Sequence, residues 1–164
     1  MRVTGGKSIY GAAVGILMLD ARFPRIPGDM GNATTWPFPV HYKIVRSATP
    51  DRVVRGGAEG LLDVFVAAAR ELVDDGVDGI TTNCGFLSLF QQELADAVGV
   101  PVATSSLMQV AQVNRLLAKG RRAGILTISG STLTPLHLEK AGVPEGTPVG
   151  AVYGYTTMLW KLAE

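Results

Sequence analysis

The chain has 164 residues, of which 47% are hydrophobic and 18% charged, and its formal net charge is +1. A chain this apolar can bury a core, which excludes intrinsic disorder for most of its length. The balanced charge argues against nucleic acid as a partner. One cysteine cannot form an intramolecular disulfide, so a reducing, cytoplasmic location fits best.

Short β-rich segments alternate with longer amphipathic ones, a pattern typical of α/β folds. The first is the apolar run Val14–Leu19, which is expected to be a central parallel strand buried on both faces. A signal peptide is the alternative interpretation of residues 9–19, but no small-x-small cleavage site follows them. The stretch is also too short to span a membrane, and we expect no membrane partner.

A long irregular loop follows at residues 21–40, with four Pro and two Gly. In chain order, the sequence then predicts a strand at 41–45, a helix at 58–73, a strand at 79–82, a helix at 86–98, a strand at 102–104, a helix at 106–117, a strand at 123–128, a helix at 133–141 and a strand at 149–153. Right-handed crossovers would join these elements into an open parallel sheet with helices on both faces.

A short motif recurs within the chain. Gly15-Ile16-Leu17 in the first predicted strand is repeated as Gly124-Ile125-Leu126, with an offset of 109 residues. If the repeat marks a second copy of the same βα unit, residues 1–118 form a first α/β lobe and residues 119–164 an incomplete second lobe.

Polar residues lie at the predicted carboxyl ends of the strands, where open α/β sheets bind their ligands. These are Asp20, residues 81–85 (TTNCG), residues 103–106 (ATSS) and residues 127–132 (TISGST). Small hydroxyl and amide side chains beside free N–H groups of helix starts can hold a carboxylate or a phosphate. The sequence therefore indicates an anion site, with ordinary helix N-caps as the alternative for each turn.

Cys84 lies between a predicted strand and a predicted helix that begins near Phe86, with Asn83 and Gly85 completing the turn. The positive end of a helix dipole would stabilise a thiolate there, so Cys84 is a candidate reactive thiol. The alternative is a buried cysteine that acts only as a small apolar side chain.

Arg22 and Arg25 lie in the long loop, which we expect to be mobile and to close over an acidic substrate. Solvated loop arginines are the alternative. His41 and His137 lack metal-ligand spacing and are expected at the surface; a Cys–His hydrolase would require the fold to bring one of them to Cys84.

Three segments together resemble the aspartate/glutamate racemase superfamily, which includes hydantoin racemases and maleate isomerases. They are VGILML with Asp20 at its end, the TTNCGF turn, and AGILTISGSTLTP. The resemblance spans nearly the whole chain. It implies two similar α/β lobes around one cleft, with cofactor-free proton transfer at a carbon next to a carboxylate.

By the same resemblance, two thiols act on opposite faces of the substrate, and Cys84 is the first. Asp20 and Asn83 would orient the thiol or the substrate, and Thr127, Ser129 and Ser131 would belong to an anion-binding turn. Nothing in the sequence asks for pyridoxal phosphate or a metal. The second thiol would fall 109 residues after Cys84, beyond Glu164, so we expect a truncated second lobe unless that lobe has been lost.

The resulting hypothesis is a cofactor-independent racemase or epimerase, an isomerase, acting on an amino acid or a related small carboxylate. Its alternatives are a one-thiol isomerase or decarboxylase of the same superfamily and a non-catalytic protein that binds small acids. A homodimer is an assembly that the sequence leaves open.

Overall fold

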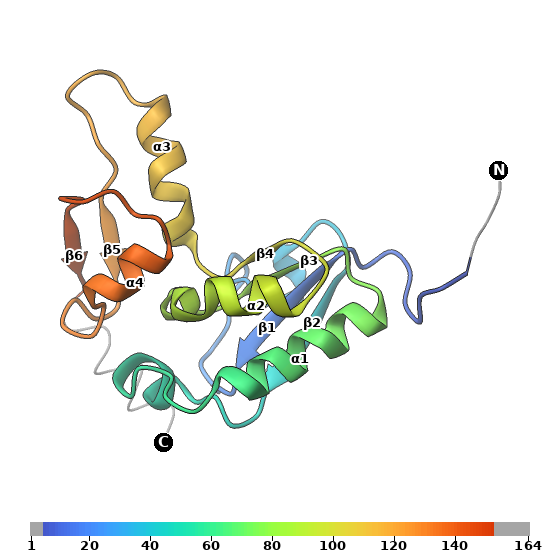
Figure 1. The fold of residues 1–164 in the computed structure, drawn as a ribbon. Helices are drawn as coiled ribbons and strands as arrows, with labels where there is room; N and C mark the ends of the chain where they lie inside the picture. The colour runs from blue at the N-terminus through green and yellow to red at the C-terminus, as the bar shows by residue number, and fades with distance from the viewer. Residues whose placement is uncertain (1–4, 153–164) are drawn as a thin grey trace.

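The computed structural model describes residues 5–152. Its main sheet has four parallel strands in the order β2-β1-β3-β4, and a separate parallel pair is formed by β5 and β6 (Figure 1). The strands are β1 (Val14–Leu19), β2 (Val40–Val45), β3 (Gly79–Thr82), β4 (Val102–Ala103), β5 (Ile125–Thr127) and β6 (Val149–Ala151). The predicted α/β class, a parallel sheet flanked by helices, is confirmed.

The helices connect these strands. They are the 3₁₀ turn η1 (Ala33–Thr35), the π-helix η2 (Asp51–Arg55), α1 (Leu62–Asp75), the 3₁₀ helix η3 (Gly85–Phe90), α2 (Gln91–Ala97), the 3₁₀ turn η4 (Ser106–Gln109), α3 (Val110–Leu116) and α4 (Pro135–Lys140). None of the helices among residues 5–152 combines the length and the apolar character that a membrane crossing requires.

Strand β1 is the centre of the main sheet, as its unbroken apolar sequence predicts. All of its residues except Val14 are buried, and it pairs in parallel with β2 on one side and β3 on the other. Gly15 lets α1 approach closely, because a Cβ built there would lie 3.0 Å from Leu72 Cδ1 and 3.3 Å from Val77. The glycine therefore sets the distance between α1 and the sheet.

Helix α1 begins four residues later than predicted. Gly57, Ala58 and Gly60 have positive φ angles, which a right-handed helix cannot contain, and they make a turn between η2 and α1. The helix ends as expected at Gly76, which has φ 108° and donates its backbone N–H to the Leu72 and Val73 carbonyls.

The two helices predicted after β3 and β4 each begin as a 3₁₀ segment, η3 and η4, before the α-helical geometry of α2 and α3. In Figure 1, β5, β6 and α4 lie beyond one end of the main sheet, with α3 leading toward them. β5 and β6 are shorter than predicted, and the expected end of the last strand at Tyr153 lies outside the described residues. The division into lobes at residue 118 stays a prediction.

Candidate functional site

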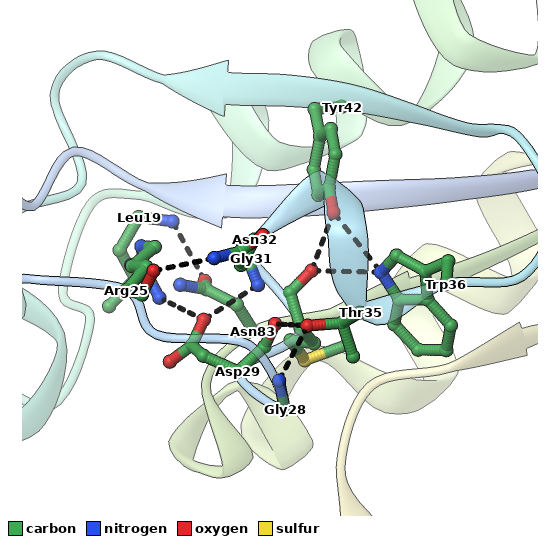
Figure 2. Close-up of polar contacts among 11 residues, drawn as sticks. Leu19, Arg25, Gly28, Asp29, Gly31, Asn32, Thr35, Trp36, Tyr42 and Asn83 are labelled. Atoms are coloured by element: carbon green, nitrogen blue, oxygen red, sulfur yellow. Dashed lines mark hydrogen bonds and ion pairs between the residues drawn. The ribbon is translucent and has the colours of Figure 1, made fainter.

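The turn after β3 is fastened to both neighbouring strands. The buried Thr82 donates its hydroxyl to the Thr104 carbonyl at 2.7 Å and accepts the Cys84 N–H at 3.3 Å. Asn83 donates its backbone N–H to the Leu17 carbonyl at 3.1 Å. Its side-chain Oδ1 accepts the Leu19 N–H at 2.9 Å (Figure 2). Cys84 therefore stands at a fixed place at the carboxyl edge of the sheet.

A cavity of about 360 Å³ opens at this edge. It is bounded by the end of β1, the long loop, the cysteine turn, the start of η4 and the β5 strand with its following turn. The lining residues are Leu19, Ala21, Phe23, Arg25, Asp29, Pro50, Val54, Asn83, Cys84, Gly85, Phe86, Ser106, Leu107, Ile125, Leu126, Thr127, Ile128 and Leu133. Both sheets thus contribute to a largely apolar cavity of a size suited to a small molecule.

The Cys84 thiol is partly buried and packs against the core. Burial raises its pKa to about 11, although the backbone N–H groups of Phe86 and Leu87 act to lower it. The sequence predicted a lowered pKa from a helix dipole, and that prediction is wrong. The six-residue 3₁₀ segment that follows Cys84 supplies too little stabilisation to offset the loss of water. A pKa of about 11 leaves the thiol protonated at neutral pH.

The long loop brings one of its two predicted arginines to the cavity. Arg25 lines it, and its Nη1 donates to Asp29 Oδ1 at 2.8 Å. The Arg25 carbonyl accepts the Asn32 Nδ2–H at 2.7 Å, and Asp29 Oδ1 also accepts the Gly31 N–H at 2.6 Å. Figure 2 shows this group beside Asn83. Arg22 is exposed and does not line the cavity.

Further hydrogen bonds close the loop on itself and onto β2 (Figure 2). Thr35 Oγ1 donates to the Asp29 carbonyl at 2.6 Å and accepts the Gly28 N–H at 2.9 Å. Tyr42, on β2, donates its hydroxyl to the Met30 carbonyl at 2.8 Å, and the Trp36 indole N–H reaches the same carbonyl at 3.1 Å. The loop has a defined internal structure; its expected motion on ligand binding stays a prediction.

Of the other sequence candidates, Asn83, Gly85 and Thr127 line the cavity with Cys84, whereas Asp20, Ser129 and Ser131 do not. The Asp20 carboxylate lies 3.6 Å from Nη1 of the largely exposed Arg46, with which it forms a surface ion pair. Ser129 and Ser131 pair their hydroxyls at 3.3 Å. The fold thus gathers about half of the expected site.

Among the lining residues that sequence reasoning missed are Phe23, Asp29 and Phe86. The spacing of Arg25 and Asp29, four residues apart with opposite charges, was the one signal available for the acid. The aromatic residues gave none, because an aromatic residue next to a loop or a helix start is equally typical of a core.

His137 is buried, at 2% exposure, and not at the surface as predicted. Its ring stands edge-on to the Phe86 ring, with centroids 5.2 Å apart, and its Nδ1 accepts the Thr134 N–H at 3.1 Å. His41 Nε2 lies 3.5 Å from Asp75 Oδ2. Neither histidine lines the cavity with Cys84, so the fold does not assemble the pair that a Cys–His hydrolase needs.

Comparison with known proteins gives lyases as sequence relatives. No protein-family model matches the chain. It is 28% identical over 132 residues to dimethylsulfoniopropionate lyase of Durusdinium sp. clade D, an alignment of 79% of this chain and 44% of that enzyme. It is 29% identical over 126 residues to dimethylsulfoniopropionate lyase 3 of Emiliania huxleyi (strain CCMP1516), covering 76% of this chain and 33% of that enzyme. The chain spans less than half the length of either relative.

Among solved structures, a glycine-to-cysteine mutant of arylmalonate decarboxylase in a sulfate-associated form aligns with a TM-score of 0.52 and 21% identity. The alignment covers 88% of this chain and 65% of that one, and at this identity it shows a shared fold alone. An aspartate racemase homologue from Pyrococcus horikoshii aligns with a TM-score of 0.48 and 18% identity over 92% of this chain and 67% of that one.

These findings correct the functional hypothesis drawn from the sequence. The curated relatives are named as lyases, so the prediction of a racemase, and with it of an isomerase, is wrong.

Proposed function

We propose that this chain carries the proton-accepting thiol of a β-eliminating lyase. Its substrate would be a small carboxylate with a sulfonium group on the β-carbon. The observation that carries the proposal is the position of Cys84 in a small apolar cavity together with Arg25 and Asn83. The similarity to dimethylsulfoniopropionate lyases supports the choice of leaving group.

The lining of the cavity suits both ends of such a substrate. The Arg25 guanidinium uses Nη1 for Asp29, and its other N–H groups make no hydrogen bond within residues 5–152, so they are available to a carboxylate. Phe23 and Phe86 also line the cavity, and aromatic faces attract methylated cations. The proposed orientation places the carboxylate at Arg25 and the dimethylsulfonium at the aromatic side chains.

In the proposed reaction, the Cys84 thiolate removes a proton from the carbon next to the carboxylate. The electrons of that C–H bond form the new C=C bond, and those of the C–S bond leave with sulfur. The products are acrylate and neutral dimethyl sulfide, and Cys84 becomes a thiol that returns its proton to solvent. Elimination needs one proton-accepting group, whereas inversion of a carbon needs an acid and a base on opposite faces, so this reaction suits a site built on Cys84.

Because the pKa of Cys84 is high, a bound cationic substrate would help to form the thiolate that acts as the base. Burial raises the pKa of Cys84 to about 11, so the thiolate is scarce at neutral pH. A sulfonium cation that enters the same apolar cavity favours the charged form of the thiol and lowers its pKa. The base would thus be generated chiefly when a cationic substrate is bound.

The test is turnover of dimethylsulfoniopropionate by the purified chain, with dimethyl sulfide measured by gas chromatography and acrylate by NMR. Cys84→Ser should lower kcat by about 10²–10⁴-fold, because a hydroxyl is a far weaker acid than a thiol and is not ionised near neutral pH. Circular dichroism should show the same fold in both proteins. A wild-type rate in Cys84→Ser, or no release of dimethyl sulfide by a folded chain, would contradict the proposal.

A further inference from the structure

We infer that Asp29 is a specificity-determining residue of the Cys84 cavity, which selects zwitterionic carboxylates over dicarboxylates of the same length. Among the lining residues that the structure describes, Arg25 and Asp29 are the charged ones, and they have opposite signs. The inference rests on the proposed function for the class of substrate. It concerns which charges the cavity accepts, and it is independent of the rate of the chemical step.

Asp29 is held in place by its own loop. Its Oδ1 accepts the Gly31 N–H at 2.6 Å and the Arg25 Nη1–H at 2.8 Å. Its backbone carbonyl accepts the Thr35 hydroxyl at 2.6 Å and the Asn32 N–H at 3.0 Å. The carboxylate therefore keeps its position beside Arg25 without help from a ligand.

The glycine at position 31 makes this arrangement possible. A Cβ on Gly31 would lie 2.6 Å from Arg25 Cδ and 2.6 Å from Met18 Cε, so a larger residue would displace the arginine. The backbone of the loop at Gly31 thus packs directly against the Arg25 side chain. This packing fixes the position of the Arg25–Asp29 pair in the cavity wall.

The pair has a direct consequence for ligand charge. Asp29 Oδ2 makes no hydrogen bond within residues 5–152, so one carboxylate oxygen remains to face a positive group. A zwitterion with its carboxylate at Arg25 places its cation in the rest of the cavity, whose lining includes Asp29 as well as Phe23 and Phe86. A dicarboxylate of equal length places its second negative charge in the same cavity as the Asp29 carboxylate, and the like charges repel. Without the Asp29 charge, Arg25 would favour dianions.

The experiment compares two probes of matched length that lack the sulfonium leaving group, 3-(trimethylammonio)propionate and succinate, by isothermal titration calorimetry. Wild-type chain should bind the zwitterion more tightly. Asp29→Asn keeps an oxygen that can accept the Arg25 and Gly31 hydrogen bonds but removes the charge. It should shift the ratio of the two dissociation constants toward succinate by about tenfold or more, which is ~1.4 kcal/mol.

Asp51→Asn is the matched control. Asp51 pairs with Arg55 at 3.2 Å and with the same four-residue spacing, but on the exposed surface of η2 and outside the cavity. This variant should leave the ratio of dissociation constants unchanged.

An unchanged ratio of the two dissociation constants in Asp29→Asn would overturn the inference; if both affinities fall equally and the Tm is lowered, Asp29 is a purely structural residue. The inference also fails if the wild-type chain binds succinate as tightly as the zwitterion, or binds neither probe. Failure to release dimethyl sulfide would count against the proposed function alone, because neither probe has to react.

Discussion

Cys84 shows how one residue's surroundings can reverse an expectation based on position. A helix start lowers a thiol pKa only when the thiol stays hydrated or meets several aligned N–H groups. Here burial is the larger effect and raises the pKa to about 11, while the N–H groups of Phe86 and Leu87 only reduce the shift. The thiol is protonated at neutral pH until something in the cavity supplies positive charge.

This predicts the pH dependence of alkylation. The thiolate is the reactive form, so the rate of Cys84 modification by iodoacetamide should keep rising as the pH increases through 9 and level off near the pKa of about 11. Saturating 3-(trimethylammonio)propionate should move the midpoint to lower pH, measured with iodoacetamide at a concentration that still reaches the site. A midpoint below about 8 without any ligand would contradict the burial argument.

At the scale of elements, the approach of α1 to β1 depends on Gly15. Gly15→Ala should destabilise the fold by about 1–3 kcal/mol, because the added Cβ would lie 3.0 Å from Leu72 Cδ1 within a packed layer. Urea denaturation followed by circular dichroism measures the change. Gly79→Ala is the control, since that strand glycine has only the Pro101 carbonyl oxygen nearby, at 3.6 Å. Equal losses in the two variants would show that close packing of α1 is not the cause.

At the scale of the whole molecule, α4 joins the β5–β6 unit to the cysteine turn. The Ser88 hydroxyl, on η3, donates to the His137 carbonyl at 3.0 Å, and Lys140 Nζ lies 3.0 Å from Glu93 Oε1 on α2. The His137 ring packs on the ring of Phe86, a residue that lines the cavity. The buried contact between α4 and η3 therefore holds the two sides of the cavity together.

His137 should make that contact sensitive to acid. Burial lowers its pKa below the ordinary value, so the unfolded chain binds a proton more readily than the folded one. Its contribution to stability is present above a pH of about 6.5 and is lost as the pH falls through the lowered folded pKa. Chemical denaturation from roughly pH 7 to 5 should show this loss, and His137→Leu should flatten it. The same slope in both proteins would rule out His137 as the source.

Local patterns determined a large part of this protein. The apolar run of β1 predicted a central buried strand, Gly76 predicted the end of α1, and the turn at Asn83, Cys84 and Gly85 predicted one wall of the site. These features depend on side-chain hydrophobicity and backbone freedom within a few residues, which a sequence displays directly.

Only the tertiary structure decided which residues meet at the cavity and what ionisation state they have there. In the folded chain Arg25 lines the cavity and Arg22 does not, and Asp29, Phe23 and Phe86 join the lining. Asp20 pairs with Arg46, and His137 is buried. Each outcome depends on contacts between segments far apart in the chain. The pKa of Cys84 depends likewise on how much water those segments exclude, a quantity that exists only once they have packed together.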